Sequence, residues 1–484
     1  MRKNRNRLLR NFKLKFTEEP EKGNKDTIPE GKQHQTLMDQ FLMNFKDLAD
    51  LTLTEFQHLN LKIYYFEHLI DKNRFEQLLT KIRRLTKEQL HEYITQSEFR
   101  LVQDAAQVEE AILNGDGILF INDSPYELPY KNGESRSITA SETESVILGA
   151  HDAFVESMDV NLSLIRRRLP SSKLKAISIQ IGNLGRNTVY LLYIEDLVAK
   201  DDLEDLKNRL KSVKKDAIAD TNMLVQYIDE HPNSPFPQFY TTERPDVTVY
   251  KLLDGKIVGL FDNSPYAFCT PVSFFDFMES MDDFGQRWIV GTFIRATRYA
   301  AILVTLMFTA LYVSVTTFHY EMIPQALLPT LIESRSRVPF PPVIEALFLE
   351  FLLELLREAG ARLPSKVGQT IGIVGGIVIG QAAVEAGITS NILIIVVAAS
   401  AIASFVVPSY LMSTSIRIVR FGFIVISGFW GNIGIIFGMG LLIIHLAGLT
   451  NLNSPYLLPL SPTYPKFFKY ALIRGALKKN TERR

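Results

Sequence analysis

Residues 289–318 read IVGTFIRATRYAAILVTLMFTALYVSVTTF, and this run decides the class of the fold. Further apolar runs follow it, at residues 341–356, 368–387, 391–412 and 421–449. A soluble protein cannot hide so many long apolar runs, so a lipid bilayer must solvate some of them. All except the run at 341–356 are long enough to cross about 30 Å of hydrocarbon. The sequence therefore predicts a helical membrane domain over residues 288–450.

The chain before this domain has a different composition. Residues 1–287 are rich in Lys, Arg, Asp and Glu, and over the whole chain 53 basic residues balance 53 acidic ones. A net charge of zero creates no overall field that would attract nucleic acid. The single cysteine, Cys269, excludes a disulfide within the chain, and no Cys/His cluster has the spacing of a zinc site. We therefore expect no metal and no cofactor.

The first 36 residues are expected to form a flexible basic leader. The stretch MRKNRNRLLRNFKLKF at residues 1–16 has no apolar centre, so it does not resemble a cleavable signal peptide. We therefore expect the soluble region to stay in the cytoplasm and the first membrane helix to leave from that side. Attraction of the leader to anionic membrane lipid is expected to be a secondary effect. A second basic segment, the C-terminal tail, covers residues 451–484.

An internal repeat covers the soluble region. The run IYYFEHLIDK from Ile63 resembles LLYIEDLVAK from Leu191. Downstream, GILFINDSPY from Gly117 resembles VGLFDNSPY from Val258. Both matches occur in the same order in the two halves, which indicates a duplication rather than chance.

Each half of the repeat has the pattern of an α/β unit. An apolar strand precedes a helical stretch, and a later strand ends in an Asn/Asp-Ser-Pro turn. These turns could be ligand loops, but their residues suit a strand-to-strand turn for backbone reasons, and we favour that structural role. The sequence predicts two cytoplasmic α/β subdomains, at residues 37–150 and 151–287.

Two connecting segments lie in the second predicted subdomain. Residues 154–169 have helical periodicity and end in Arg166, Arg167 and Arg168, which suit either the helix macrodipole or an interface. Residues 232–245 contain too many prolines for a helix or an interior strand, so we expect an ordered, extended connector there.

The short apolar run at residues 341–356 carries three carboxylates. At helical pitch Glu350 and Glu354 lie one turn apart on one stripe, and Glu345 lies well around the helix from them. Carboxylates that face lipid cost several kcal/mol each, so the stripe should face water, a pore or a partner helix. In a symmetric oligomer the stripe would form an acidic ring, which is one way to build a cation path. These three residues are our pore-lining candidates.

The acidic stripe has two alternative roles, which the sequence leaves open. The run could be an amphipathic helix at the membrane interface, or its carboxylates could form ion pairs with Arg295 or Arg298. Both arginines, together with Glu385, are charged residues inside or beside predicted membrane helices.

Four glycines recur at every fourth position of the run at 368–387: Gly368, Gly372, Gly376 and Gly380. They form one smooth face that lets helix backbones approach closely. We expect them to pack helices together, and a contact between subunits is one form of this packing. Nucleotide binding is disfavoured, because no strand precedes these glycines and no P-loop lysine follows them.

The membrane topology is left open by the sequence. The basic loops around Arg362 and around Arg417 favour the cytoplasmic side. Both loops can lie on that side only if the short acidic run also crosses the membrane. The run at 421–449 must then form a hairpin, or the tail must lie outside.

Several motifs together resemble the A subunit of GerA-family spore germinant receptors. They are Phe154-Val-Glu-Ser157 with Leu164-Ile-Arg-Arg-Arg168, Ser234-Pro-Phe-Pro-Gln238, Thr242-Glu-Arg-Pro-Asp246, Arg287-Trp-Ile289, Phe318-His319 with Glu321-Met-Ile-Pro324, Val338-Pro-Phe-Pro-Pro342, Leu356-Arg-Glu-Ala-Gly360, and GGIVIGQAAVEAG at 375–387. The match covers nearly all of the chain after residue 37. Each motif is weak alone, and their combination is specific.

This resemblance implies a multi-pass protein of the spore inner membrane. It implies assembly with a transporter-like B subunit, which binds the nutrient, and a lipoprotein C subunit. It also implies a homo-oligomer of A subunits that forms a nutrient-gated cation channel and has no enzymatic activity. One alternative is a paralogue that resembles the stage V sporulation protein AF and acts downstream of receptors. Another is a secondary ion transporter that uses Glu350 or Glu385. No nucleophile–base constellation supports an enzyme.

Overall fold

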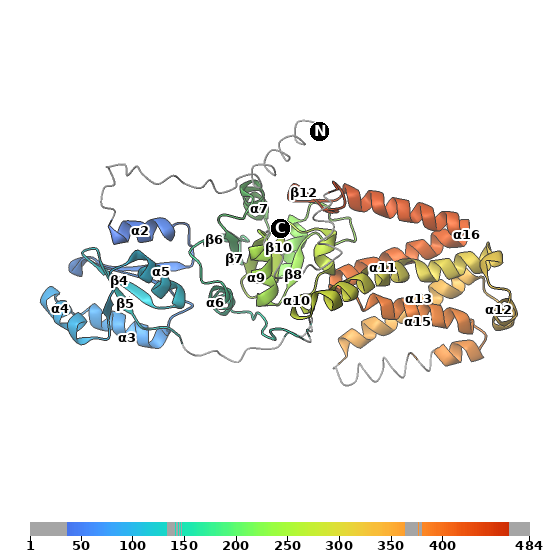
Figure 1. Ribbon diagram of the computed structural model, residues 1–484, viewed down its shortest axis with the longest axis horizontal. Coiled ribbons are helices and arrows are strands. Elements are labelled where there is room, and N and C mark those ends of the chain that lie inside the picture. Colours follow the sequence, from blue (N-terminus) through green and yellow to red (C-terminus); the bar gives the residue numbers. More distant parts are fainter. Residues whose placement is uncertain are drawn as a thin grey trace, which may run out of the picture.

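The computed structural model describes residues 36–132, 141, 144, 146, 148–363, 376 and 380–463. Along its long axis lie a first sheet with helices, a second sheet with helices, and a set of long helices (Figure 1). The predicted fold class, an α/β region of two related parts followed by apolar helices, is confirmed. Residues 1–35 of the predicted leader and 464–484 of the predicted tail lie outside the described residues.

The first α/β unit is a five-stranded antiparallel sheet with its helices. After α2 (Leu37–Asn44), its elements are β1 (Leu51–Phe56), β2 (Leu61–Phe66), α3 (Lys72–Ile82), α4 (Lys87–Gln96), β3 (Arg100–Leu101), α5 (Ala105–Asn114), β4 (Gly117–Ile121) and β5 (Ser124–Leu128). The strand order is β1-β2-β4-β5-β3. Local signals start the helices: Asp71 caps α3, and Thr86 and Gln89 form a capping box on α4.

The second unit repeats this succession of elements. After α6 (Met158–Arg168), it contains β6 (Leu174–Ile181), β7 (Asn187–Ile194), α7 (Lys200–Ser212), α8 (Thr221–Ile228), β8 (Tyr240–Thr242), α9 (Pro245–Leu253), β9 (Ile257–Phe261) and β10 (Ala267–Thr270). Its strand order is β6-β7-β9-β10-β8. In both sheets the third strand along the chain lies at one edge, paired with the fifth strand. This shared topology agrees with the repeat found in the sequence.

The repeated Asn/Asp-Ser-Pro segments are turns between strands, which is the structural role that their residues favour. Asn122 and Asp123 link β4 to β5, and Asn263 lies between β9 and β10, all three with positive φ. Asn and Asp tolerate this left-handed conformation better than most residues. The proline-rich segment differs in part from the prediction, because Tyr240–Thr242 pairs with β10 as an edge strand.

A buried ion pair joins the two units. The Arg166 guanidinium on α6 donates from Nε and Nη2 to the two Asp50 carboxylate oxygens, each at 2.9 Å, and from Nη1 to the Leu174 carbonyl at 2.8 Å. Both side chains are almost fully buried. The arginines at the end of α6 suit either the helix macrodipole or an interface. Arg166 is an interface residue.

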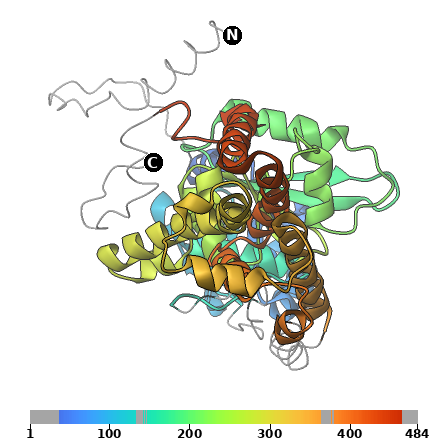
Figure 2. The ribbon, with the colours of Figure 1, turned by 90° about the vertical axis from the view of Figure 1, so that its right-hand side faces the viewer.

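The C-terminal half consists of long helices. After the short α10 (Asp282–Gly285), they are α11 (Trp288–Thr317), α12 (Leu328–Arg335), α13 (Pro342–Arg362), α15 (Asn391–Ser404) and α16 (Tyr410–Gly448). Two short strands, β11 (Thr450–Asn451) and β12 (Ser454–Pro455), follow. Figure 2 shows these helices lying side by side when the molecule is viewed from their end.

The apolar run at 391–412, although long enough to cross a bilayer, is divided between two helices. α15 ends at Ser404, and α16 begins only at Tyr410, so the last run is longer than predicted at its N-terminal side. Pro408 lies in the break, where it cannot continue a helix and restricts the residue before it.

α16 is a helical hairpin, one of the two solutions that the sequence left open. At Gly431 the backbone is non-helical, with φ 60° and ψ −140°. Residues beyond the bend pack on residues before it, since a Cβ added at Gly438 would lie 3.3 Å from the Phe423 ring. Glycine suits both the positive φ and the close approach of the two halves.

We expect Gly434→Leu to open this hairpin. A Cβ at Gly434 would lie 2.5 Å from the Ile426 carbonyl oxygen, a backbone atom that cannot move aside easily. Overpacking of this kind costs about 1–3 kcal/mol, which a lower thermal unfolding midpoint in detergent would reveal. The matched control is Gly440→Leu in the same half of α16, where a Cβ would have no described atom within 4 Å. Equal midpoints for the two variants would contradict the expectation.

Each described long helix runs either away from the second α/β unit or back toward it. α11 leaves that unit and reaches the hairpin bend, where Ser314 donates to Asn432 at 2.7 Å. α13 starts beside α12 and ends near Ser404, and α15 runs the same way. The second half of α16 returns to the unit, where His445 lies 2.9 Å from Ser234. Arg362, Arg417 and Arg420, which the sequence placed in loops, lie within α13 and α16, and they share one end of the helical bundle with residues 449–463.

Candidate functional site

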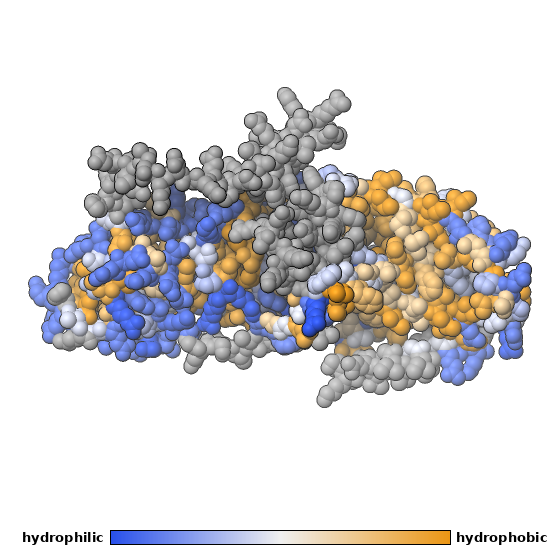
Figure 3. All heavy atoms as spheres, viewed as in Figure 1, coloured by the Kyte–Doolittle hydropathy of each residue, from blue (hydrophilic) through white to orange (hydrophobic). Residues whose placement is uncertain are grey.

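The surface of the helical half is apolar. Figure 3 shows hydrophobic residues across the helices, in contrast to the hydrophilic α/β region. Phe293, Phe429, Ile433 and Ile436 are each more than two-thirds exposed. Soluble proteins rarely expose apolar patches of this extent, so such a surface suits lipid. Among the described helices, α11 and α16 are long and apolar enough to cross a membrane.

Glu350 forms a buried ion pair between helices. Its Oε2 lies 2.6 Å from Nη2 of Arg420 on α16, and its Oε1 accepts a hydrogen bond from Thr309 on α11 at 2.8 Å. The Glu350 side chain is fully buried, and Arg420 also donates to Ser400 on α15 at 3.1 Å. Four helices therefore meet at this one pair of charges.

Glu354 lies one turn further along α13, at the edge of the same cluster. Its Oε1 is 3.3 Å from Nη2 of Arg417, and its Oε2 is 3.8 Å from Nη1 of Arg357. The Glu354 side chain is 35% exposed, in contrast to Glu350. The partners of the acidic stripe are therefore arginines of α13 and α16, so the alternative of ion pairs with Arg295 or Arg298 is wrong.

Glu345 lies at the opposite end of α13. Its Oε1 accepts from the Ser390 amide at 2.5 Å and from Thr389 Oγ1 at 3.1 Å, where α15 begins. Arg335 of α12 lies 3.8 Å from the other carboxylate oxygen. Glu345 is 1% exposed, so this carboxylate joins three helices at the end far from the α/β region.

Arg295 and Arg298 connect α11 to the segment that precedes it. Nη1 of Arg298 donates to Asp283 Oδ2 at 2.7 Å, and Nη2 of Arg295 donates to the same oxygen at 3.3 Å. Arg295 also lies 3.6 Å from Glu279. Arg295 and Asp283 are fully buried, and Arg298 nearly so. These two predicted charged residues therefore tie the first long helix to the second α/β unit.

The glycine face lies only partly within the described residues. Gly368 and Gly372 fall outside them, as does most of the run at 368–387. A Cβ added at Gly376 or Gly380 would meet no described atom within 4 Å. Glu385 is exposed and accepts a hydrogen bond from Gln381, one turn earlier, at 2.9 Å. Within the described part of the chain, this segment presents small and polar residues outward.

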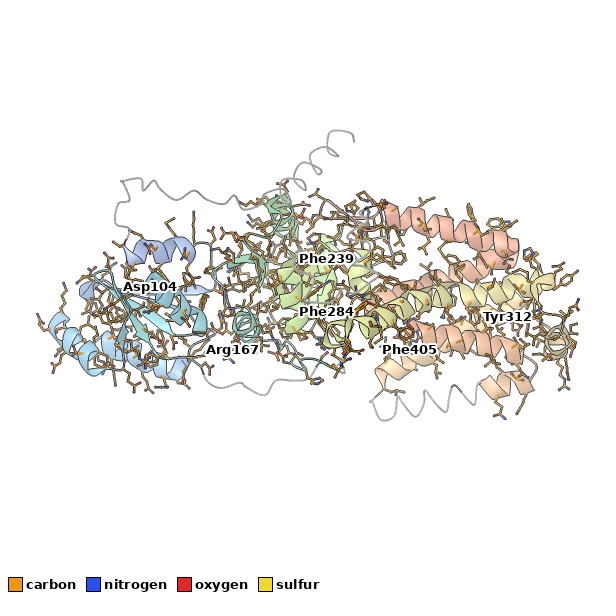
Figure 4. All side chains as sticks on the ribbon, in the orientation of Figure 1. Asp104, Arg167, Phe239, Phe284, Tyr312 and Phe405 are labelled. Carbon is orange, nitrogen blue, oxygen red and sulfur yellow. The ribbon has the colours of Figure 1, made fainter. Side chains whose placement is uncertain are left out.

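A cavity of about 490 Å³ lies where the second α/β unit meets the helices. The α/β side contributes Glu144, Lys251, Asp276 and Phe284, and the helical side contributes Arg357, Phe405 and Arg417. Phe284 lines it from the α/β side and Phe405 from the helical side, and both are labelled in Figure 4. We call this the junction cavity.

Charges on the α/β side of the junction cavity are compensated. Lys251 donates to Asp276 at 2.6 Å and lies 3.8 Å from Glu279, and nearby carboxylates hold the pKa of its buried ammonium above the usual value. The pKa of Glu144 is raised to about 7, mainly because its carboxyl is buried away from water. This carboxyl also accepts a hydrogen bond from Thr242 at 2.8 Å.

Sequence reasoning missed three of these features: the arginine partners on α16, the role of Asp283, and the junction cavity. A signal for the first was present, because Arg417 and Arg420 are three residues apart and precede an apolar run. Such arginines face a common side of a helix and need carboxylates of another helix. Among the described residues, no group of three or more His, Cys, Asp or Glu side chains could hold a metal ion.

A duplicated α/β region joined to apolar helices with buried ion pairs defines a membrane-type protein with a large extramembrane part. The chain belongs to the family described as Bacillus/Clostridium GerA spore germination protein, whose model matches residues 39–484. The family resemblance drawn from the sequence motifs is therefore confirmed.

Individual relatives agree with this assignment. The chain is 43% identical to spore germination protein GerQA of Bacillus cereus over 92% of this chain and 90% of that protein. It is 41% identical to spore germination protein A1 of Bacillus subtilis strain 168 over 82% and 83%. Among solved structures, the N-terminal domain of the A subunit of the Bacillus megaterium spore germinant receptor GerK3 matches 49% of this chain and 94% of that structure, but its 20% identity and TM-score of 0.38 are too low to support the assignment.

Proposed function

We propose that this chain is the A subunit of a nutrient germinant receptor and forms an oligomeric, nutrient-gated cation channel in the spore inner membrane. Family membership supports a role in spore germination. The channel rests mainly on one observation: Glu385 and Gln381 are exposed on an otherwise apolar segment. A carboxylate in contact with lipid costs several kcal/mol, so another chain or water must cover this face.

The open glycine face supports an oligomer. Gly376 and Gly380 meet no described atom within 4 Å, and small residues at this spacing would let a second copy of the chain pack closely against this side. A symmetric oligomer would arrange the copies of Glu385 in a ring near the end of the helices far from the α/β region. Such rings attract cations into a pore.

The three carboxylates of α13 stay pore-lining candidates, but they differ in burial and therefore in how well each could face a pore. Glu345 and Glu350 are buried and face arginines of their own chain, so we assign them first to holding helices together. Glu354 is partly exposed, so of the three carboxylates it is the best placed to contact water in a pore.

The α/β region is proposed to lie on the cytoplasmic side of the membrane, with two further subunits as partners. Arg357, Arg362, Arg417 and Arg420 lie toward the α/β end of the helices, and Arg335 lies at the far end. Because basic residues are in excess on the cytoplasmic side of membrane proteins, this distribution favours a cytoplasmic α/β region. A transporter-like B subunit that binds the nutrient and a lipoprotein C subunit would complete the receptor. The AF-like paralogue remains the second candidate, and germination without any receptor partner would favour it.

We expect Glu385→Gln to lower cation conductance several-fold in liposomes that contain the purified oligomer. The substitution removes the charge and keeps the shape, so assembly should be retained. The matched control is Glu333→Gln, an exposed carboxylate on α12 at the same end of the helices. Conductance equal to wild type in both variants, at equal oligomer content, would remove Glu385 from the pore. No conductance from the wild-type oligomer, with and without its partners, would overturn the channel.

A further inference from the structure

The junction cavity has an excess of positive charge on its helical side. Three arginines, Arg357, Arg417 and Arg420, face two carboxylates, Glu350 and Glu354, among the described residues. The Coulombic partners of Arg357 and of Arg420 all belong to this same group of five. The five residues therefore leave one positive charge without a counter-charge, in a site largely removed from water.

Three guanidinium nitrogens in this group are buried and lack a hydrogen-bond partner in the described structure: Nη1 of Arg357, Nε of Arg417 and Nε of Arg420. Of the three arginines, Arg357 and Arg417 line the cavity. Arg417 donates from Nη1 to Ser413 at 3.2 Å and from Nη2 to Thr414 at 2.9 Å. Arg357 donates from Nη2 to Ser404 at 3.1 Å. Buried donors without acceptors are costly, so this arrangement calls for an anion.

The carboxylates across the cavity do not supply this anion. Asp276 and Glu279 are engaged by Lys251. Asp282 accepts a hydrogen bond from the Leu148 amide at 3.0 Å. The pKa of Glu144, about 7, leaves this carboxyl substantially protonated in neutral solution. Each of these four groups is therefore engaged or neutralised on its own side of the cavity.

The rim of the cavity is apolar on the side of the helices. Phe405 is 70% exposed and stacks under the Arg357 guanidinium, 4.6 Å from it, and Tyr410 is also largely exposed. Both line the cavity: Phe405 lies in the break between α15 and α16, and Tyr410 is the first residue of α16. A ligand with an anionic head and an apolar tail can place the head between the arginines and the tail along these rings. Arginine binds phosphate oxygens well because its donors form a planar fork.

We propose that the junction cavity binds the phosphate group of an acidic phospholipid, held by Arg357 and Arg417. The site lies at the boundary between the apolar helices and the α/β region, where a headgroup would be found. This proposal requires that the helices lie in a membrane, but it is independent of channel activity. A failure of the conductance test above would leave it unaffected.

The test compares wild-type protein with Arg357→Gln and the matched control Arg362→Gln. Arg362 lies on the same helix and is 79% exposed, so its loss removes the same charge outside the cavity. Each protein is placed in phosphatidylcholine vesicles with and without phosphatidylglycerol, and thermal unfolding is followed. We expect phosphatidylglycerol to raise the midpoint of wild type and Arg362→Gln, and Arg357→Gln to lose more than half of that rise.

A second measurement guards against a folding defect in Arg357→Gln. Native mass spectrometry from detergent should show phosphatidylglycerol retained by wild type and Arg362→Gln, and lost from Arg357→Gln. Equal losses in the two variants, or no response to phosphatidylglycerol in wild type, would overturn the site. In a further arm, millimolar inorganic phosphate replaces the acidic lipid. A full midpoint rise from phosphate alone would keep the anion site and overturn the lipid as its source.

Discussion

Replacing Glu350 by alanine is expected to prevent stable folding of the helical half. The substitution leaves Arg420 fully buried without its counter-ion, together with the Thr309 hydroxyl that donated to Glu350. Removing one partner of a buried ion pair costs about 3–5 kcal/mol, a large part of the stability of most domains. The expected result is a strong loss of monodisperse protein in detergent and a much lower unfolding midpoint.

Two further variants distinguish the loss of the buried ion pair from the loss of any one charge on α13. Glu358→Ala removes a carboxylate of the same helix that is 57% exposed and pairs with Arg362, so it should behave as wild type. Glu350→Gln combined with Arg420→Gln removes both charges and should recover part of the loss. Wild-type stability of Glu350→Ala would show that the pair does not hold these helices together. A loss of ion flux in Glu350→Ala can be assigned to a pore only after its folding has been checked.

Asp283→Asn is expected to uncouple the first long helix from the second α/β unit. The amide has nearly the same shape as the carboxylate but carries no charge, so Arg295 and Arg298 would share a neutral partner. Glu279, 3.6 Å from Arg295, can compensate only one of the two arginines. The loss expected for a broken buried pair is again about 3–5 kcal/mol.

Limited proteolysis measures this uncoupling directly. We expect faster cleavage of Asp283→Asn near Arg287, between the α/β unit and α11, together with a lower unfolding midpoint. Asp282→Asn is the neighbouring control, since an amide oxygen can still accept the hydrogen bond from Leu148. Identical cleavage of the two variants would contradict a coupling role for Asp283.

Local patterns in the sequence predicted much of this fold. The repeat predicted two related units, because residues such as Asn122 and Asn263 specify turns through their own backbone preferences. The apolar runs predicted the helical half, because run length is a local property. The family could be recognised because its motifs are continuous in sequence.

Contacts between distant segments could not be predicted in the same way. The α16 partners of Glu350 and Glu354, which are Arg420 and Arg417, lie more than 60 residues away along the chain. Periodicity places a side chain on a face of a helix without saying what covers that face. The helix break at 405–409 was missed because hydropathy does not change there, although Pro408 marked it. The hairpin at Gly431 stayed one of two solutions, because several glycines in that run could have formed the bend.

The return of the last helix to the α/β region has a mechanical consequence. Beyond α16, Asn451 accepts a hydrogen bond from Thr270 at 2.8 Å, and the Tyr456 hydroxyl donates to the Pro237 carbonyl at 2.7 Å. The second α/β unit is thus attached to the helical bundle at two places: the start of α11 and the segment just after the end of α16. Because α11 and α16 are both attached to that unit and pack directly on each other, tilting of the unit would move the two helices together.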